Sequence, residues 1–293
     1  MKTKKLASLL TVVGLGLALA STPASALIQY FFPQTNFEDN DIDRIIDTNG
    51  NGVVDIGDRF ISVQEYVQTS GNSAGQGPTP IGPEELTVIV DITAVALVGN
   101  NVIFAPTPGG LLSGFAPGTA AVGWVDNTPD LDVINGNCLT LANCAALAGL
   151  GGTDGSTLYV TLGFFGDPDA NIVGAPAGGA TSISIAAVAG GGPNTSFGNI
   201  NFALQIGVNN SGFTFGPQAC APFCGLGGDG QIVGAVGSGN LLGGVGLNQA
   251  EFTARSDNDF GLRPLVVPEP GSLALVALAL VGIGAVGRRR TKM

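Results

Sequence analysis

The chain has 293 residues, and 47 of them are glycine, about twice the usual share, which favours turns and short strands over helices. Seven of its eleven basic residues lie within the first five or the last six positions, whereas all 22 acidic residues lie between them. So acidic a body excludes nucleic acid and anionic headgroups as electrostatic partners, and the lack of histidine excludes a Ser-His-Asp triad.

The N-terminal segment has the three parts of a secretory signal peptide. Lysines in the first five residues precede an uncharged run over residues 6–20, and Ala24 and Ala26 supply the small-x-small pattern that signal peptidase cleaves. A true transmembrane helix is the alternative, but a core of about fifteen residues is too short to span a bilayer. We predict that residues 1–26 are removed and that the mature chain begins at Leu27.

An acidic cluster opens the body of the chain, with carboxylates at Glu38, Asp39, Asp41 and Asp43. Such a cluster can supply oxygen ligands to a cation. Charge runs are more often solvated faces, and we therefore expect these side chains to be exposed to water.

Residues 47–58, DTNGNGVVDIGD, have the ligand spacing of a calcium loop, with glycine at the sixth position for the sharp turn. The loop resembles that of dockerins and related EF-hands, and the resemblance implies Ca²⁺ as a cofactor. Its ligands would be Asp47, Asn49, Asn51, the Val53 carbonyl, Asp55 and Asp58. The favoured alternative is a bare Asn-Gly hairpin turn, because residues 59–63 alternate like a strand where an EF-hand has a helix. A second dockerin repeat is missing.

The body shows the period-two alternation of half-buried strands at many places. The clearest cases are residues 86–92, 158–164 and 200–208, and further candidates are residues 101–104, 121–125, 182–187, 212–215 and 250–255. Turn-rich segments separate them. We predict an all-β fold, an antiparallel β-sandwich over residues 27–263, with a candidate sub-boundary in the proline-containing stretch near residues 70–84.

Four cysteines lie in this exported part of the chain: Cys138, Cys144, Cys220 and Cys224. An even number in an oxidising compartment predicts two disulfides, and local pairing is favoured over crossed pairing. A zinc site is the alternative, but the chain offers no histidine. A short helix is expected over residues 139–147, where apolar residues fall on one face.

The single tryptophan, Trp124, is followed by Asp126, Asp130 and Asp132. An exposed tryptophan beside carboxylates can stack on and hydrogen-bond a sugar. Tryptophan is more often a core residue, and we favour that interpretation here.

The C-terminal tail has three parts in a fixed order. Pro268, Glu269 and Pro270 lie in a linker over residues 264–271, an uncharged apolar helix is expected over residues 272–287, and a basic segment closes the chain at residues 288–293. A helix of this length crosses most of a bilayer, and its flanking arginines, Arg288, Arg289 and Arg290, stay cytoplasmic. The body therefore lies outside the inner membrane.

This tail resembles the PEP-CTERM sorting domain of Gram-negative bacteria that make exopolysaccharide. The resemblance implies that an exosortase, a membrane-embedded processing enzyme, recognises Pro268, Glu269 and Pro270 as substrate. The expected partners are signal peptidase, the exosortase and the inner membrane, with exopolysaccharide as a further candidate. The expected final location is the outer surface or the extracellular matrix.

These observations favour a non-catalytic protein of the envelope or exopolysaccharide matrix, structural or adhesive in biofilm or floc formation. A calcium-dependent carbohydrate-binding module is the first alternative. A secreted glycan-active enzyme is the second, although no pair of carboxylates is singled out for glycoside hydrolysis.

Overall fold

The alternating segments assemble into one 11-stranded antiparallel sheet, described here from a computed structural model. The structure describes residues 35–70, 79–80, 84–126, 129–133, 136–152, 155–247, 251–263 and 265. Apart from Leu265, all of these belong to one compact unit.

The strands of the large sheet are β1 (Thr35–Ile46), β2 (Arg59–Ser70), β3 (Thr79–Pro80), β4 (Glu85–Val98), β5 (Asn101–Pro106), β6 (Thr119–Asp126), β7 (Thr157–Gly163), β8 (Asn171–Pro176), β9 (Ser196–Asn209), β12 (Gly234–Gly243) and β13 (Ala254–Leu262). Two short strands, β10 (Gln218–Ala219) and β11 (Gln231–Ile232), pair separately. The helices are α2 (Leu141–Leu147), η1 (Ala177–Gly179) and α3 (Ile185–Gly190).

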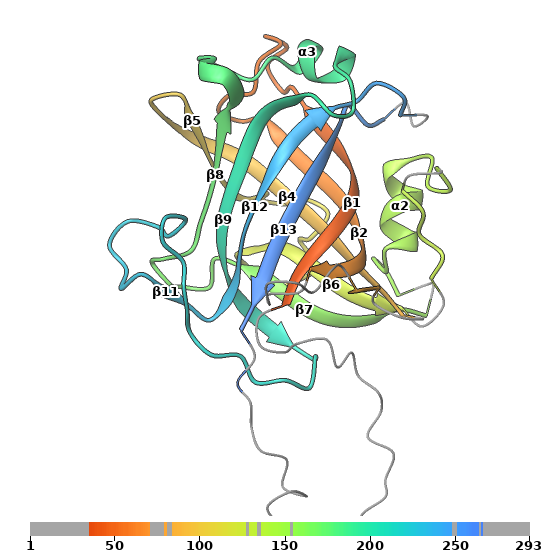
Figure 1. Cartoon of the computed structure of the whole chain (residues 1–293), viewed down its shortest axis with the longest axis vertical. Helices are drawn as coiled ribbons and strands as arrows, with labels where there is room; N and C mark the ends of the chain where they lie inside the picture. Colours follow the sequence, from red (N-terminus) through yellow and green to blue (C-terminus); the bar gives the residue numbers. More distant parts are fainter. Residues whose placement is uncertain are drawn as a thin grey trace, which may run out of the picture. The chain divides into compact units, whose positions relative to one another are not determined.

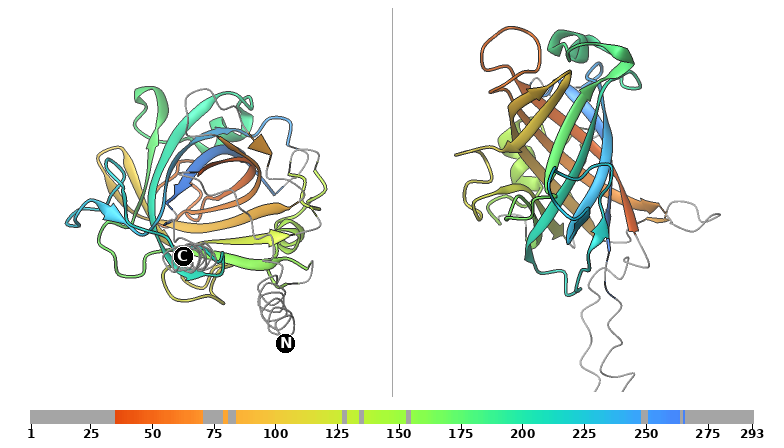
Figure 2. Two further views of the ribbon diagram at one scale, coloured as in Figure 1. Left: turned by 60° about the horizontal axis from the view of Figure 1, so that its bottom comes forward. Right: turned by 90° about the vertical axis from the view of Figure 1, so that its left-hand side faces the viewer.

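The sheet closes on itself, so the predicted sandwich is wrong and the fold is a barrel (Figures 1 and 2). Strands β2, β1, β13, β12, β9, β7, β6 and β4 follow one another around the ring, and pairing of β2 with β4 closes it. Strands β5 and β8 form a second bridge from β4 to β9. The candidate sub-boundary near residues 70–84 separates no second core, because β2 and β4 pair directly across it.

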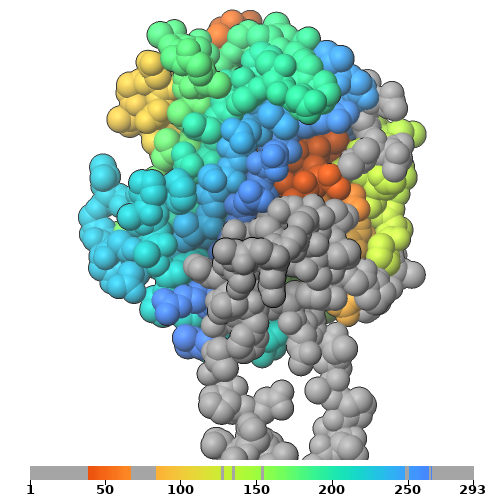
Figure 3. All heavy atoms as spheres, viewed as in Figure 1, coloured from red at the N-terminus to blue at the C-terminus, as the bar shows by residue number. Residues whose placement is uncertain are grey.

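The barrel interior is an apolar core to which nearly every strand contributes. Its buried side chains include Leu86, Val88 and Ile92 of β4 together with Leu204 of β9. One end of the barrel is covered by the segment around α3, whose Val188 is fully buried in the same core. Figure 3 shows this segment packed over the upper end.

A second core lies outside the barrel, beneath what we call the covering segment (residues 129–133 and 136–152), which carries α2 beside β1 and β2 (Figure 1). The segment packs on the outward faces of β1, β2, β4 and β6. The buried residues include Ile42, Ile61, Val63, Ile89, Val122 and Trp124 from the strands and Leu131, Val133, Leu141 and Ala145 from the segment. The barrel therefore has a core on each side of these four strands.

The helix expected over residues 139–147 is confirmed as α2, and its N-cap is Thr140, whose Oγ1 accepts a hydrogen bond from Asn143 N at 3.2 Å. Two predicted strands are wrong. Residues 182–187 lead into α3, because Ser184 caps that helix by accepting from Ala187 N. Residues 212–215 form no strand, and Asn209 instead folds the chain by bonding to Ser211 and to the Phe213 carbonyl.

Glycine makes room for polar side chains on the inner face of β12. A Cβ at Gly239 would collide with the side chain of Asn258 on the neighbouring β13. A Cβ at Gly237 would collide with Phe202 and with the carbonyl of Asp259. The glycines of this strand therefore let the interior accept Asn258, which binds the aspartates described below.

Candidate functional sites

The loop over residues 47–58 is folded around the carboxylate of Asp47. This carboxylate accepts hydrogen bonds from the backbone N–H groups of Gly50 at 2.7 Å, Asn51 at 3.3 Å and Gly52 at 2.7 Å. These N–H groups, led by that of Gly52, hold the pKa of Asp47 below its usual value. Gly50 and Gly52 both have positive φ, 72° and 78°, which explains the need for glycine at these turns.

Three further loop side chains converge. The amide of Asn49 donates to Asp55 at 2.9 Å, and the amide of Asn51 donates to the other oxygen of Asp55. Asp58 has a different role, because it is buried and accepts from Thr48 N at 2.8 Å and Asp55 N at 2.9 Å. The structure thus gathers Asn49, Asn51 and Asp55, while Asp58 holds the loop closed.

The loop is also part of the barrel's upper end. Val54 N donates to the Ile183 carbonyl at 2.9 Å, and Ile185 N donates to the Gly52 carbonyl at 3.0 Å. Val54 itself is buried in the interior core. Residues 52–54 therefore help to fasten the α3 segment over the end of the barrel, whatever else the loop does.

The expectation of a solvated acidic face is wrong for the next site, the interior aspartate row (Asp39, Asp41 and Asp43). Their side chains point into the barrel from β1, with Asp41 and Asp43 only 5% and 0% exposed. The residues paired with them on β2 are Tyr66, Gln64 and Ser62. On the other side of β1, Ser256 and Asn258 of β13 contact the row. The side chain of Glu38 lies outside the described residues.

Hydrogen bonds satisfy this row only in part. Asp41 accepts from the backbone and the hydroxyl of Ser256 and from Asn258 Nδ2 at 2.8 Å, and Asp39 Oδ1 accepts from Asn258 N at 2.7 Å. Asp39 Oδ2 and both carboxylate oxygens of Asp43 are buried with no partner at hydrogen-bond geometry. The hydroxyls of Ser62 and Ser256 nevertheless lie near enough to Asp43 to lower its pKa in part.

The environment favours the protonated acids. Burial raises the pKa of Asp39 to about 8 and that of Asp43 to about 7. Burial, and then repulsion from Asp43 and Asp39, raises the pKa of Asp41 well above its usual range. Asp39 and Asp43 therefore hold their protons up to about neutral pH, and Asp41 holds its proton well above the usual range of an aspartate.

Two cavities lie in the barrel, and both are small. One, of about 50 Å³, is lined by apolar side chains together with Gln64, Tyr66 and Asn258, and the other is about 40 Å³. Ligand pockets usually start at roughly 300 Å³. Neither of these two cavities, formed by residues that the structure describes, has room for a sugar.

A further set of carboxylates on the outer face was not found from the sequence. Glu65 of β2 and Glu85 of β4 point toward the covering segment, where Glu65 accepts from Val133 N at 3.4 Å and Glu85 from Asp130 N at 3.2 Å. Burial raises the pKa of each to about 7. The available signal was that Glu65 continues the period-two series of Ile61 and Val63, which are buried outward positions.

Trp124 lies in the outer core and is 4% exposed, so the sugar-stacking interpretation is wrong. Its ring meets that of Phe115 edge to face at 6.0 Å. Asp126, on the same strand, is also buried, whereas Asp130 is exposed.

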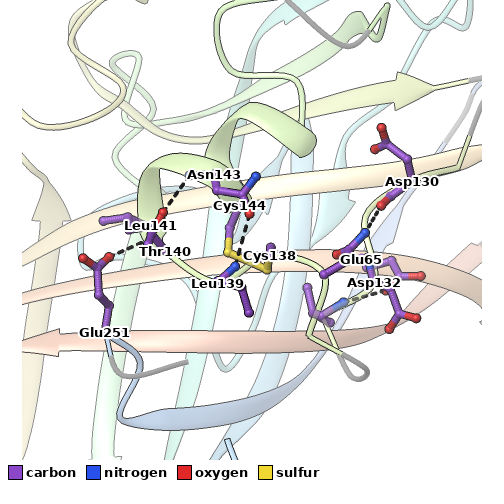
Figure 4. The surroundings of a disulfide bond; sticks show 12 residues. Glu65, Asp130, Asp132, Cys138, Leu139, Thr140, Leu141, Asn143, Cys144 and Glu251 are labelled. Carbon is purple, nitrogen blue, oxygen red and sulfur yellow. Dashed lines mark hydrogen bonds between the residues drawn. A yellow bond between two sulfur atoms is a disulfide. The ribbon is translucent and has the colours of Figure 1, made fainter. Parts of the chain in front are cut away.

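Both disulfides are local, as favoured from the sequence. They join Cys138 to Cys144 and Cys220 to Cys224, so the described thiols are not available as zinc ligands. The first ties the middle of α2, at Cys144, to the residues before the helix. Figure 4 shows Glu251 reaching the start of the same helix, where Leu141 N donates to it at 2.7 Å. The second closes the loop between β10 and β11.

The two targeting ends lie outside the described residues. This applies to Ala24 and Ala26, to the Pro268, Glu269 and Pro270 motif, to the helix expected over residues 272–287 and to the three arginines that follow it. Within the ranges that the structure describes, no helix is long and apolar enough to cross a membrane.

Comparison with known proteins identifies one feature of the chain. The PEP-CTERM protein-sorting motif matches residues 266–290. Searches against curated proteins and against solved structures each gave no match. The chain therefore carries the sorting motif of an exported, membrane-transiting protein that an exosortase targets.

Proposed function

We propose that the chain is a non-catalytic protein of the cell surface or exopolysaccharide matrix, displayed after exosortase processing, with a structural or adhesive role. The observation that carries this proposal is the sorting motif at residues 266–290. That motif determines how the protein is exported and sorted, whereas its role after sorting depends on the body of the chain.

Three properties of the body support a structural role. The ring of strands is closed by pairing of β2 with β4, so its strands have few free edges to pair with other chains. Two disulfides fasten its outer loops, which suits an oxidising exterior. The cavities of the barrel are too small for a glycan, which argues against catalysis by the interior aspartates.

The first prediction concerns processing. Replacing Pro268, Glu269 and Pro270 together by alanine should abolish cleavage, because these residues would be the segment that the exosortase reads. Intact mass spectrometry of envelope and medium fractions measures this directly: wild type should lack its C-terminal residues, whereas the variant should extend to Met293 and stay with the inner membrane.

The matched control is Pro264→Ala, which alters a proline just outside the matched residues and should be processed like wild type. A wild-type protein that ends at Met293 in every fraction would contradict processing. If processing occurs but neither floc formation nor binding to exopolysaccharide changes in a strain lacking the protein, the structural and adhesive role is wrong.

A second candidate is a calcium-dependent carbohydrate-binding function. It is favoured by the conformation of residues 47–58, in which Asp47 organises the backbone and the side chains of Asn49, Asn51 and Asp55 meet. Carboxylate and amide oxygens are the ligands that Ca²⁺ prefers. The amides of Asn49 and Asn51 would have to turn their oxygens toward the ion, and Asp58 would contribute only after leaving its backbone partners.

The second prediction tests this loop. If it binds Ca²⁺, a concentration about a hundred times the Kd should stabilise the fold by about 2.7 kcal/mol, measured as a rise in Tm. Asp55→Asn should lower that rise by the share that the loop contributes, whereas Asp257→Asn, an exposed residue on β13, should keep the full rise. If the rise in Tm is unchanged in the Asp55→Asn chain, residues 47–58 are a structural turn. A glycan array with and without Ca²⁺ would then distinguish a carbohydrate-binding protein from a purely structural one.

A further inference from the structure

Three carboxylates converge on the outer face of the barrel, where the covering segment begins. Glu85 and Asp126 are directly opposite each other on β4 and β6, and Asp130 comes from the covering segment. One oxygen from each lies within 4.8 Å of the other two. Figure 4 shows Asp130 and Asp132 on the stretch of chain that leads to the disulfide at Cys138.

Glu85 provides an independent indication that something is bound here. Its side chain is 3% exposed, and its Oε2 accepts hydrogen bonds from Asp130 N at 3.2 Å and Leu131 N at 3.4 Å. Its other oxygen, Oε1, is buried and has no hydrogen-bond partner. A buried carboxylate oxygen without a donor is costly, so this atom requires a proton or a cation.

Three of the protein's arginines have partners elsewhere, and the fourth stands on another strand. The chain between the targeting ends has no lysine and four arginines. Arg44 and Arg59 form ion pairs with Glu251 and Asp91. Arg263 donates to the Pro217 carbonyl at 2.9 Å, and Arg255 stands on β13 opposite Leu242 of β12.

We propose that Glu85, Asp126 and Asp130 bind a divalent cation of the calcium class. Ca²⁺ takes six to eight oxygen ligands at about 2.3–2.6 Å, so two ligands of one ion can lie up to about 5 Å apart, and the observed separation fits. Zinc would favour histidine or thiolate, which this site lacks. Exposed Asp130 leaves one side open for water ligands and for exchange of the ion.

The ion would have a definite mechanical effect. It would join the ends of β4 and β6 to residue 130, which begins the covering segment, beside the hydrogen bonds from Asp130 N and Leu131 N to Glu85. Removal of the ion should loosen the covering segment before the barrel. This site is separate from residues 47–58 and does not depend on the proposed function.

The competing explanation is a proton on Glu85 shared with a neighbouring carboxylate. Burial raises the pKa of Glu85 to about 7. The two backbone hydrogen bonds to Glu85 lower this pKa, and the charges of Glu65 and Asp130 raise it further. Protons and Ca²⁺ would therefore compete at this site, and the test must distinguish them.

The third prediction uses Tb³⁺ as a luminescent substitute for Ca²⁺, with the full chain purified in detergent. Trp124 is the only tryptophan and stands two residues before Asp126 on the same strand face, about 7 Å along the strand. Excitation where tyrosine absorbs little should therefore produce terbium emission that rises to one equivalent and that Ca²⁺ displaces. Trp124→Phe should lose the emission and keep Ca²⁺ binding by calorimetry.

Matched variants locate the ion. Asp130→Asn, at an exposed position that does not threaten folding, and Glu85→Gln should each weaken binding by at least about tenfold, since even outer-shell partners contribute that much. Asp55→Asn, in the loop over residues 47–58, should leave the emission unchanged. Three results would each overturn the proposal. The first is wild type without tryptophan-sensitised emission, and the second is binding by Asp130→Asn and Glu85→Gln as tight as that of wild type. The third is loss of the emission in Asp55→Asn.

Discussion

Raising the pH from about 5 to about 8.5 should lower the free energy of unfolding, because the interior aspartate row keeps its protons in the folded state. In the unfolded chain these groups ionise above about pH 4. Their folded pKa values are raised, to about 8 for Asp39 and about 7 for Asp43. Unfolding between these limits releases protons, so stability is fully present below about pH 4 and declines as the pH rises through 7 to 8.

Each proton retained only by the folded state contributes a slope of about 1.4 kcal/mol per pH unit. Glu65 and Glu85, with pKa values raised to about 7, act in the same direction. The measurement is urea unfolding at several pH values and constant ionic strength. Stability that increases over this range would contradict the burial of the row.

Asp43→Asn is the informative variant, because it replaces a fully buried ionisable side chain with a neutral one of nearly the same shape. It should flatten the pH dependence and make the chain more stable than wild type at about pH 8.5, with little difference at about pH 5. Asp257→Asn, exposed on the outer side of β13, is the control and should change stability by less than about 0.5 kcal/mol.

Trp124→Ala should destabilise the protein by about 3–5 kcal/mol, a large part of a typical domain's total stability. The indole fills the space between β6 and the covering segment, in edge-to-face contact with Phe115. It also packs so closely on the chain at Gly149 that a Cβ there would lie 2.7 Å from its Cγ. Loss of the indole leaves a cavity between Phe115 and the chain at Gly149, both of which then lose their contacts with it.

Unfolding of this variant must be followed by circular dichroism, because the only tryptophan is gone. Trp124→Phe, which keeps an aromatic ring against Phe115, should lose distinctly less stability than the alanine variant. Leu226→Ala, at a fully exposed leucine, should be nearly neutral. An alanine variant as stable as wild type would mean that the outer core contributes little.

Sequence patterns identified those strands whose inward side chains are apolar. Leu86, Val88 and Ile92 alternate with polar residues, and β4 lies where they predict it. The alternation did not predict β1 or β12, and it reached only the first residues of β13. The inward side chains of β1 and β13 are polar: Asp39, Asp41 and Asp43 on β1, and Ser256 and Asn258 on β13. On β12 the inward positions include glycine, which carries no hydrophobic signal.

Closure of the barrel could not be predicted for a different reason. It depends on pairing of β1 with β13, whose partners Asp43 and Ala254 are far apart in sequence, and on pairing of β2 with β4 across residues 71–84. Local alternation specifies which face of a strand is buried but not which strand lies beside it. A closed ring and a two-layer sandwich therefore look alike at this level.

Among the candidate sites, those within one short segment were predictable. The sorting motif, the two local disulfides and the loop over residues 47–58 are each contained in fewer than thirty consecutive residues. The site formed by Glu85, Asp126 and Asp130 needs β4 and β6 to pair and the covering segment to fold back on them. No local pattern contains that information.

The position of the last strand has a consequence for load bearing. Strand β13, which leads to the sorting tail, lies between β1 and β12 and is hydrogen-bonded to both. Strand β13 can therefore leave the barrel only if the hydrogen bonds of both ladders break. The strand that precedes the sorting tail is thus held along both edges, and its resistance to forced removal is set by the unfolding rate and not by equilibrium stability.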